Sequence, residues 1–261
     1  MIDFKNVGKS YGAMKVLDGI SFRIDPGEFV CITGKSGAGK STLLHLLTGA
    51  ENISRGTIEV DGVDLKVVPP SAMQLYRRRL GIVFQDYKLL KNRTVAENIA
   101  FPLEVCGVAD GEIAKRVKEV LAEMDLTRHA GTLPDALSGG EKARTAIGRA
   151  IVHDPMIVLA DEPTGNIDPE QSVHVMKLFS RIHANGTTVI IATHDSALVD
   201  TLQTRVIELK EGKVARDSVG GYEKQKPGKA PVHGHGKHEV FEEPDDGSSG
   251  RRKVKVTAVH G

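Results

Sequence analysis

The fold is decided by the stretch Gly34-Lys35-Ser36-Gly37-Ala38-Gly39-Lys40-Ser41-Thr42, which matches the phosphate-loop pattern G-x-x-x-x-G-K-[ST] at every fixed position. Residues 29–33 before it form an apolar, β-branched run that predicts a buried parallel strand, and residues 42–47 after it predict a helix. Glycines allow the backbone between them to turn tightly and direct its N–H groups at an anion. The stretch therefore predicts a site for nucleotide phosphates, in preference to a glycine-rich turn that only joins two elements.

Three side chains of the loop have separate predicted roles. Lys40 is expected to reach the β- and γ-phosphates, Ser41 to ligate Mg²⁺, and Thr42 to hydrogen-bond the α-phosphate. The expected ligands are ATP and Mg²⁺. The predicted phosphate-binding residues are Gly34, Ser36, Gly37, Ala38, Gly39, Lys40, Ser41 and Thr42.

Two further apolar runs end in polar residues. Residues 156–160 precede Asp161 and Glu162, and residues 188–192 precede His194. Asp161 is expected to hold Mg²⁺ through water and Glu162 to polarise the attacking water. Carboxylate pairs and single histidines are often ordinary surface groups, but strand ends of this kind are where parallel sheets place ligands. The sequence therefore predicts a catalytic Glu162 and a γ-phosphate sensor at His194.

A second glycine motif, Leu137-Ser138-Gly139-Gly140-Glu141, lies about a hundred residues after the first. A nucleotide already seated in the first loop does not need it. Ser138, Gly139 and Gly140 stand at the start of a predicted helix, whose N–H groups and dipole suit a γ-phosphate. The two motifs together indicate a nucleotide shared between two subunits, so a homodimer is expected on ATP binding.

The order and spacing of these motifs resemble those of ATP-binding cassette (ABC) ATPases over about residues 2–216. The resemblance implies roles for three more residues. Gln85 falls at the family's Q-loop and is expected to touch Mg²⁺ or the attacking water. Asp168 falls at the D-loop, and Tyr11 at the aromatic position that stacks on adenine, although a lone tyrosine is by itself a weak signal.

The resemblance also implies the fold: an α/β P-loop NTPase with a RecA-like core, an antiparallel β subdomain and an inserted helical subdomain. Alternation in residues 2–33 fits the β subdomain, and residues 112–121 have helical periodicity. The expected domains are an ABC ATPase domain over 1–218, with its helical subdomain at about 86–139, and a disordered tail over 219–261.

Composition narrows the function classes. The 261 residues are 40% apolar with a net charge of +1, which gives no electrostatic basis for nucleic-acid binding. Cys31 and Cys106 are the only cysteines, as is typical of a reducing cytosol. No apolar run approaches the roughly 20 residues that cross a bilayer. In the tail, a metal site at His233, His235 and His238 and a lipid contact at residues 251–255 are both less favoured than a solvated segment.

Within the ABC ATPases, residues 83–99 resemble the FtsE-type cell-division proteins. Asp86 and Tyr87 follow Gln85, where lipoprotein and macrolide exporters usually carry Phe-Asn. Two features depart from the family's usual pattern: Glu141-Lys142-Ala143-Arg144 in place of Glu-Gln-Gln-Arg, and the long tail.

This resemblance implies a partner, an FtsX-type polytopic membrane protein, and a peripheral position at the cytoplasmic face of the cell membrane through that partner. ATP-driven dimer closure would control peptidoglycan hydrolysis. The alternative is the ATPase subunit of a lipoprotein or small-molecule exporter; a soluble cassette acting on ribosomes or DNA is disfavoured because the chain has one phosphate loop. A groove near Gln85 is expected to receive a helix of the partner, with at least one of Tyr87, Leu89 and Leu90 facing it.

Overall fold

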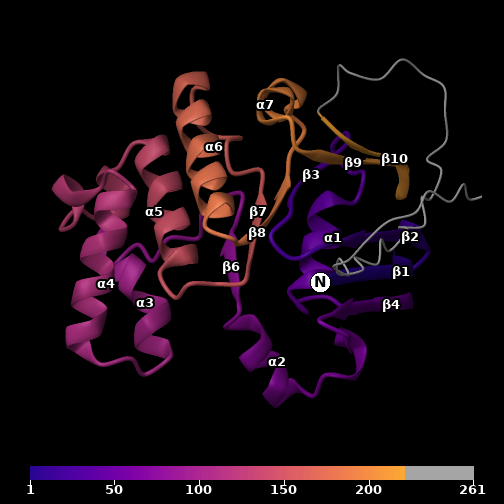
Figure 1. The fold of residues 1–261 in the computed structure, drawn as a ribbon, viewed down its shortest axis with the longest axis horizontal. Coiled ribbons are helices and arrows are strands. Elements are labelled where there is room, and N and C mark those ends of the chain that lie inside the picture. Colours follow the sequence, from indigo (N-terminus) through magenta and orange to yellow (C-terminus); the bar gives the residue numbers. More distant parts are fainter. Residues whose placement is uncertain (221–261) are drawn as a thin grey trace, which may run out of the picture. The chain divides into compact units, whose positions relative to one another are not determined.

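A six-stranded sheet in the order β10-β9-β3-β8-β7-β6 carries the centre of the fold (Figure 1). All neighbouring strands in it are parallel except β10, which pairs antiparallel with β9 at the edge. The carboxyl ends of its five parallel strands therefore meet at one edge of the sheet. The strands are β3 (Phe29–Thr33), β6 (Leu80–Val83), β7 (Ile157–Asp161), β8 (Thr188–Ala192), β9 (Arg205–Lys210) and β10 (Lys213–Val219).

Successive residues of the central strands face opposite sides of the sheet, and both sides are covered. Val30 and Ile32 pack into one hydrophobic cluster, whereas Cys31 between them packs into another. The same alternation separates Leu159 from Val158. Burial on both faces explains why these strands are continuous apolar runs in the sequence.

One face is covered by helix α1 (Lys40–Leu47) and by a second sheet in the order β2-β1-β4-β5. Neighbouring strands of this sheet pair antiparallel, and α1 buries its leucines in the cluster that both sheets share. The strands are β1 (Ile2–Tyr11), β2 (Met14–Ile24), β4 (Arg55–Val60) and β5 (Val63–Asp64).

The other face is covered by helices, of which α3, α4 and α5 form a group at the side away from β1, β2 and β4 (Figure 1). Helix α4 buries Val117, Val120 and Leu121, three of the positions marked by the periodicity of residues 112–121. The helices on this face are α3 (Val95–Val105), α4 (Asp110–Glu123), α5 (Gly139–Ile151), α6 (Pro169–Ala184) and α7 (Ser196–Leu202). Helix α2 (Pro70–Arg77) instead packs Tyr76 against the cluster of the first face, and 3₁₀ turns lie at Leu65–Val67, Thr127–His129 and Pro134–Ala136.

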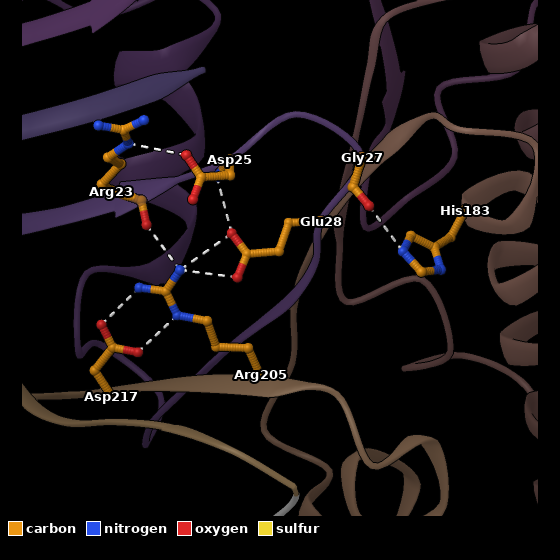
Figure 2. A network of polar contacts seen from close by, with 7 residues as sticks. All are labelled: Arg23, Asp25, Gly27, Glu28, His183, Arg205 and Asp217. Carbon is orange, nitrogen blue, oxygen red and sulfur yellow. Dashed lines mark hydrogen bonds and ion pairs between the residues drawn. The ribbon is translucent and has the colours of Figure 1, made fainter. Parts of the chain in front are cut away.

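Arg205 ties the strands together at the edge opposite their carboxyl ends (Figure 2). Its guanidinium donates to both carboxylate oxygens of Asp217 at 2.7 Å and to Glu28 at 3.0 Å. It also donates to the carbonyl of Arg23 at 2.7 Å. The hydrogen bond with Asp217 is the largest cause that raises the pKa of Arg205. These bonds join β2, β9 and β10 to Glu28, which directly precedes β3. The network therefore ties together the sheet at the edge opposite the carboxyl ends of its parallel strands.

The computed structural model describes residues 1–220, apart from the side chains of Ser196 and Ala197. Strand β10 ends at Val219, one residue past the expected domain boundary. The expectations for the tail from residue 221, including its histidines and its basic end, lie outside the described residues. Among the described residues, no helix is both long and apolar enough to cross a membrane.

Candidate functional site: a phosphate-binding cavity and a separate glycine motif

A cavity of about 880 Å³ lies where the loops after β3, β6, β7 and β8 converge. This position is the usual ligand site of a parallel sheet. Eleven of the predicted site residues line it: Tyr11, Gly34, Ser36, Gly37, Gly39, Lys40, Ser41, Thr42, Gln85, Glu162 and His194. Five lining residues were not predicted: Met14, Val16, Lys35, Asp200 and Glu208.

Two glycines of the phosphate loop have positive φ and leave no room for a side chain. At Gly34, with φ +144°, a Cβ would stand 2.3 Å from the carbonyl oxygen of Leu209. At Gly39, with φ +102°, a Cβ would stand 2.5 Å from Leu17. Gly39 is also the N-cap of α1, and no side chain caps that helix end. The amides of the first turn therefore remain available to an anion.

Lys40 is a buried cation at the floor of the loop, 6% exposed. Its Nζ donates to the carbonyl of Gly34 at 2.9 Å and lies 3.4 Å from Oε1 of Glu162. A buried ammonium is costly unless it is paired, so these contacts hold the charge in place. A phosphate oxygen could replace either of these partners.

Glu162 is held in a sparsely populated backbone conformation, with φ +46°. Its N–H donates to the carbonyl of Ala192 on β8 at 2.8 Å, and its side chain is almost fully buried. Oε2 of Glu162 lies 2.9 Å from Nδ1 of His194 and accepts from the His194 amide at 3.3 Å. Such strain costs on the order of 1–3 kcal/mol and persists where the surroundings fix it. Here it aims the carboxylate toward Lys40.

Asp161 lies directly behind the loop. The Ser41 hydroxyl interacts with its carboxylate, and Oδ1 is buried without a partner. Burial raises the pKa of Asp161, against the opposing effect of Ser41. An orphaned carboxylate oxygen beside a hydroxyl is a hard oxygen donor set, which fits Mg²⁺. Within residues 1–220 no group of three or more His, Cys, Asp or Glu side chains is arranged to hold a metal ion.

Gln85 lies at the rim of the cavity, after β6. Its carbonyl accepts a hydrogen bond from Nδ2 of Asn166 at 3.2 Å. Asn166 belongs to the segment that leads to Asp168, so the predicted Q-loop and D-loop are in direct contact.

The second glycine motif is not part of this cavity. Ser138, Gly139, Gly140 and Asp168 line a separate cavity of about 320 Å³, which includes Asn166. Ser138 caps α5 through a reciprocal pair of hydrogen bonds with Glu141, and Asp168 caps α6 by accepting from the Gln171 amide at 2.9 Å. Of the predicted nucleotide-binding residues, Ala38 and these four are absent from the lining of the first cavity.

A third cavity, the α2–α3 groove, has a volume of about 480 Å³. Leu90, Phe101 and Val105 are among its apolar residues, and Arg78, Lys88 and Arg149 are among its basic residues. At least one of Tyr87, Leu89 and Leu90 was expected to face a partner: Leu90 lines this groove, whereas Tyr87 is 5% exposed and packs in the core. Arg149 donates to the carbonyls of Tyr87 and Lys88, at 2.6 and 2.7 Å, and so holds this turn with the ring inward.

Comparisons with known proteins agree with this geometry. A family model described as ABC transporter matches residues 17–165. The chain is 46% identical over 222 residues to the cell division ATP-binding protein FtsE of Bacillus subtilis, covering 85% of this chain and 97% of that protein. It is 42% identical over 213 residues to the Escherichia coli protein of the same name, covering 81% and 96%.

Solved structures give the same result. A dimeric bacterial ABC transporter cassette superposes with a TM-score of 0.78 at 34% identity, covering 84% of this chain and 98% of that one. A dimeric ATP-binding cassette in a post-hydrolysis state, bound to ADP and Pi, gives 0.77 at the same identity and coverage. The fold class expected from the sequence is confirmed.

Proposed function

The chain belongs to the ABC transporter family, and from this premise we propose that it is the ATP-hydrolysing subunit of an FtsEX-type membrane complex that acts in cell division. It is an ATPase. The observation that carries the proposal is the buried pair of Lys40 and Glu162 beside a phosphate loop, with the exposed His194 in contact with Glu162. The name of these relatives, cell division ATP-binding protein FtsE, supports the cellular role.

In the proposed mechanism the phosphate loop binds the triphosphate through its amides, and Lys40 exchanges its contact with Gly34 for phosphate oxygens. Glu162 orients a water molecule and accepts its proton as the water oxygen attacks the γ-phosphorus. The bond to the ADP oxygen then breaks. His194 holds the second oxygen of Glu162 and fixes its direction.

Mg²⁺ would be held by Ser41, by Asp161 and, at the rim, by Gln85. When bound, it would neutralise charge on the phosphates. Tyr11 is 41% exposed and, with Met14 and Val16, forms an apolar wall of the cavity where the base would stack.

We propose that two copies share each nucleotide. Within one chain, Ser138 and Gly140 line a cavity of their own rather than the Lys40 cavity. A second copy in a two-fold, head-to-tail arrangement could present them to the γ-phosphate. The dimeric state of the similar cassettes supports this arrangement.

The proposed membrane partner is an FtsX-type polytopic protein, whose helix would occupy the α2–α3 groove. Phe101 and Val105 are large apolar side chains that are exposed there, 36% and 57% respectively. An apolar centre with basic residues around it is the composition of an interface. The partner would place the chain at the cytoplasmic face of the membrane, and dimer closure would then control peptidoglycan hydrolysis.

Co-purification with the membrane protein encoded beside this gene tests the proposal. Val105→Asp should abolish co-purification and leave the ATPase activity of the isolated chain unchanged. Val67→Asp, at an apolar residue 73% exposed and outside the groove, is the matched control. Binding that survives Val105→Asp would refute the groove. If the membrane protein encoded beside this gene has a substrate cavity across the membrane, the exporter function would be favoured instead.

A further inference from the structure

Lys9 is a charged residue in an unusual place. It lies on β1 and is only 8% exposed, whereas lysines are almost never buried unless paired. Its Nζ lies 2.7 Å from Oε2 of Glu51 and donates to the carbonyl of Asn52 at 2.8 Å. The same ammonium stands over the ring of Tyr11, 4.6 Å from its centroid.

Glu51 completes the arrangement from the loop after α1. Its carboxylate accepts a hydrogen bond from Lys9 at 2.7 Å and also interacts with the Tyr11 side chain. The Tyr11 ring therefore has a cation over its face, and Glu51 fixes the position of that cation.

These two charges lie outside the cavity that the ring helps to form. Tyr11, Met14 and Val16 line the cavity, and neither Lys9 nor Glu51 does. One face of the ring is thus engaged by Lys9, and the ring still presents surface to the cavity. An exposed tyrosine without such contacts would sample several rotamers, and ligand affinity falls in proportion to the population of the competent one.

We propose that Lys9 and Glu51 are positioning residues that hold Tyr11 as the platform for the nucleotide base. The inference rests on the proposed function, in which Tyr11 stacks on adenine. The ion pair between Lys9 on β1 and Glu51 in the loop after α1 would fix the Tyr11 ring before the nucleotide binds. This pair would affect binding of the base and not binding of the phosphates.

The test compares a ligand that has a base with one that does not. Isothermal titration with Mg²⁺ would measure the affinity of the full chain for a non-hydrolysable ATP analogue and for inorganic tripolyphosphate. Lys9→Met should lower the affinity for the analogue about three- to tenfold and should change the affinity for tripolyphosphate by no more than about twofold. Lys9→Arg should restore the affinity, because guanidinium also stacks over a ring. In ATPase assays Lys9→Met should raise KM and leave kcat unchanged.

Lys5→Met is the matched control. Lys5 lies on the same strand, but it pairs with Glu59 at 2.7 Å and with Asp3 at 3.6 Å, and the cation over Tyr11 is Lys9. It should bind both ligands as the unaltered chain does. If Lys9→Met fails to fold, Glu51→Gln is the second variant, because glutamine has nearly the shape of glutamate. It should lower the affinity for the analogue and not the affinity for tripolyphosphate.

Three outcomes overturn the inference. If Lys9→Met loses affinity equally for the analogue and for tripolyphosphate, Lys9 only supports the fold. Normal affinity of Lys9→Met for the analogue, with Tyr11→Ala weakened, would refute the positioning role and leave the base platform intact. Normal affinity of Tyr11→Ala itself would refute the platform, and the positioning role with it.

Discussion

Oε2 of Glu162 lies 2.9 Å from Nδ1 of His194, although the two residues are 32 positions apart and follow different strands. The pairing of β7 with β8 brings them together, and the amide of Glu162 adds a hydrogen bond to Ala192. The direction of the carboxylate is thus set by the sheet. The two side chains should act as one unit.

His194→Ala should therefore lower ATP hydrolysis by about 10²-fold or more while ATP binding persists, because Lys40 and the loop amides remain. Glu162→Gln should lower it by about 10²–10⁴-fold. Residues that act as a unit are not additive, so the double variant should be hardly slower than Glu162→Gln alone. Single-turnover hydrolysis rates of the unaltered protein, the two single variants and the double variant test this expectation. Additive losses would mean that His194 acts independently of Glu162.

Asp161 should weaken the nucleotide-free protein. Burial raises its pKa in the folded state, so the folded state binds a proton more readily than the unfolded state. The free energy of unfolding should then decrease as the pH rises from the pKa of Asp161 in the unfolded chain to its higher pKa in the folded protein. Asp161→Asn should raise the melting temperature of the nucleotide-free protein at neutral pH. When ATP is present, it should abolish the additional stabilisation that Mg²⁺ gives. Differential scanning calorimetry measures both, and a less stable nucleotide-free Asn variant would contradict this account.

His153 should make the protein sensitive to mild acid. Its Nε2 donates to the carbonyl of Leu80 at 3.1 Å, and its Nδ1 is buried without a partner. Burial lowers the pKa of His153, so the neutral ring is favoured in the folded state. The stability it contributes is present above the unfolded pKa of about 6.5 and is lost as pH falls below it.

Replacing His153 with Gln, which retains a donor, should reduce the loss of stability between pH 7 and pH 5. His174→Gln is the control, because His174 is 37% exposed. Denaturant unfolding at each pH measures the effect. An unchanged pH slope in His153→Gln would show that His153 does not carry the sensitivity.

The phosphate loop, the strand-end residues and the Ser138 motif could be located from the sequence because each is a contiguous pattern with its own chemistry. Lys9, Glu51 and Val16 could not be, since a single lysine or valine has no local signal and becomes significant only through its neighbours in space. The inward position of Tyr87 could not be predicted for a related reason. A tyrosine among lysines resembles an interface, but its backbone, with φ +59°, and the two hydrogen bonds from Arg149 turn it inward.

The central claim is that each nucleotide is shared by two copies of the chain. The most direct measurement mixes two inactive variants, Ser138→Arg and Lys40→Ala, and follows ATP hydrolysis. If the site is shared, a mixed dimer has one intact pair of loop and glycine motif, whereas neither homodimer has any. Equal mixing should then restore about a quarter of the unaltered activity, since half of the dimers are mixed and one of their two sites is intact. If both elements act within one chain, the mixture will stay as inactive as its components.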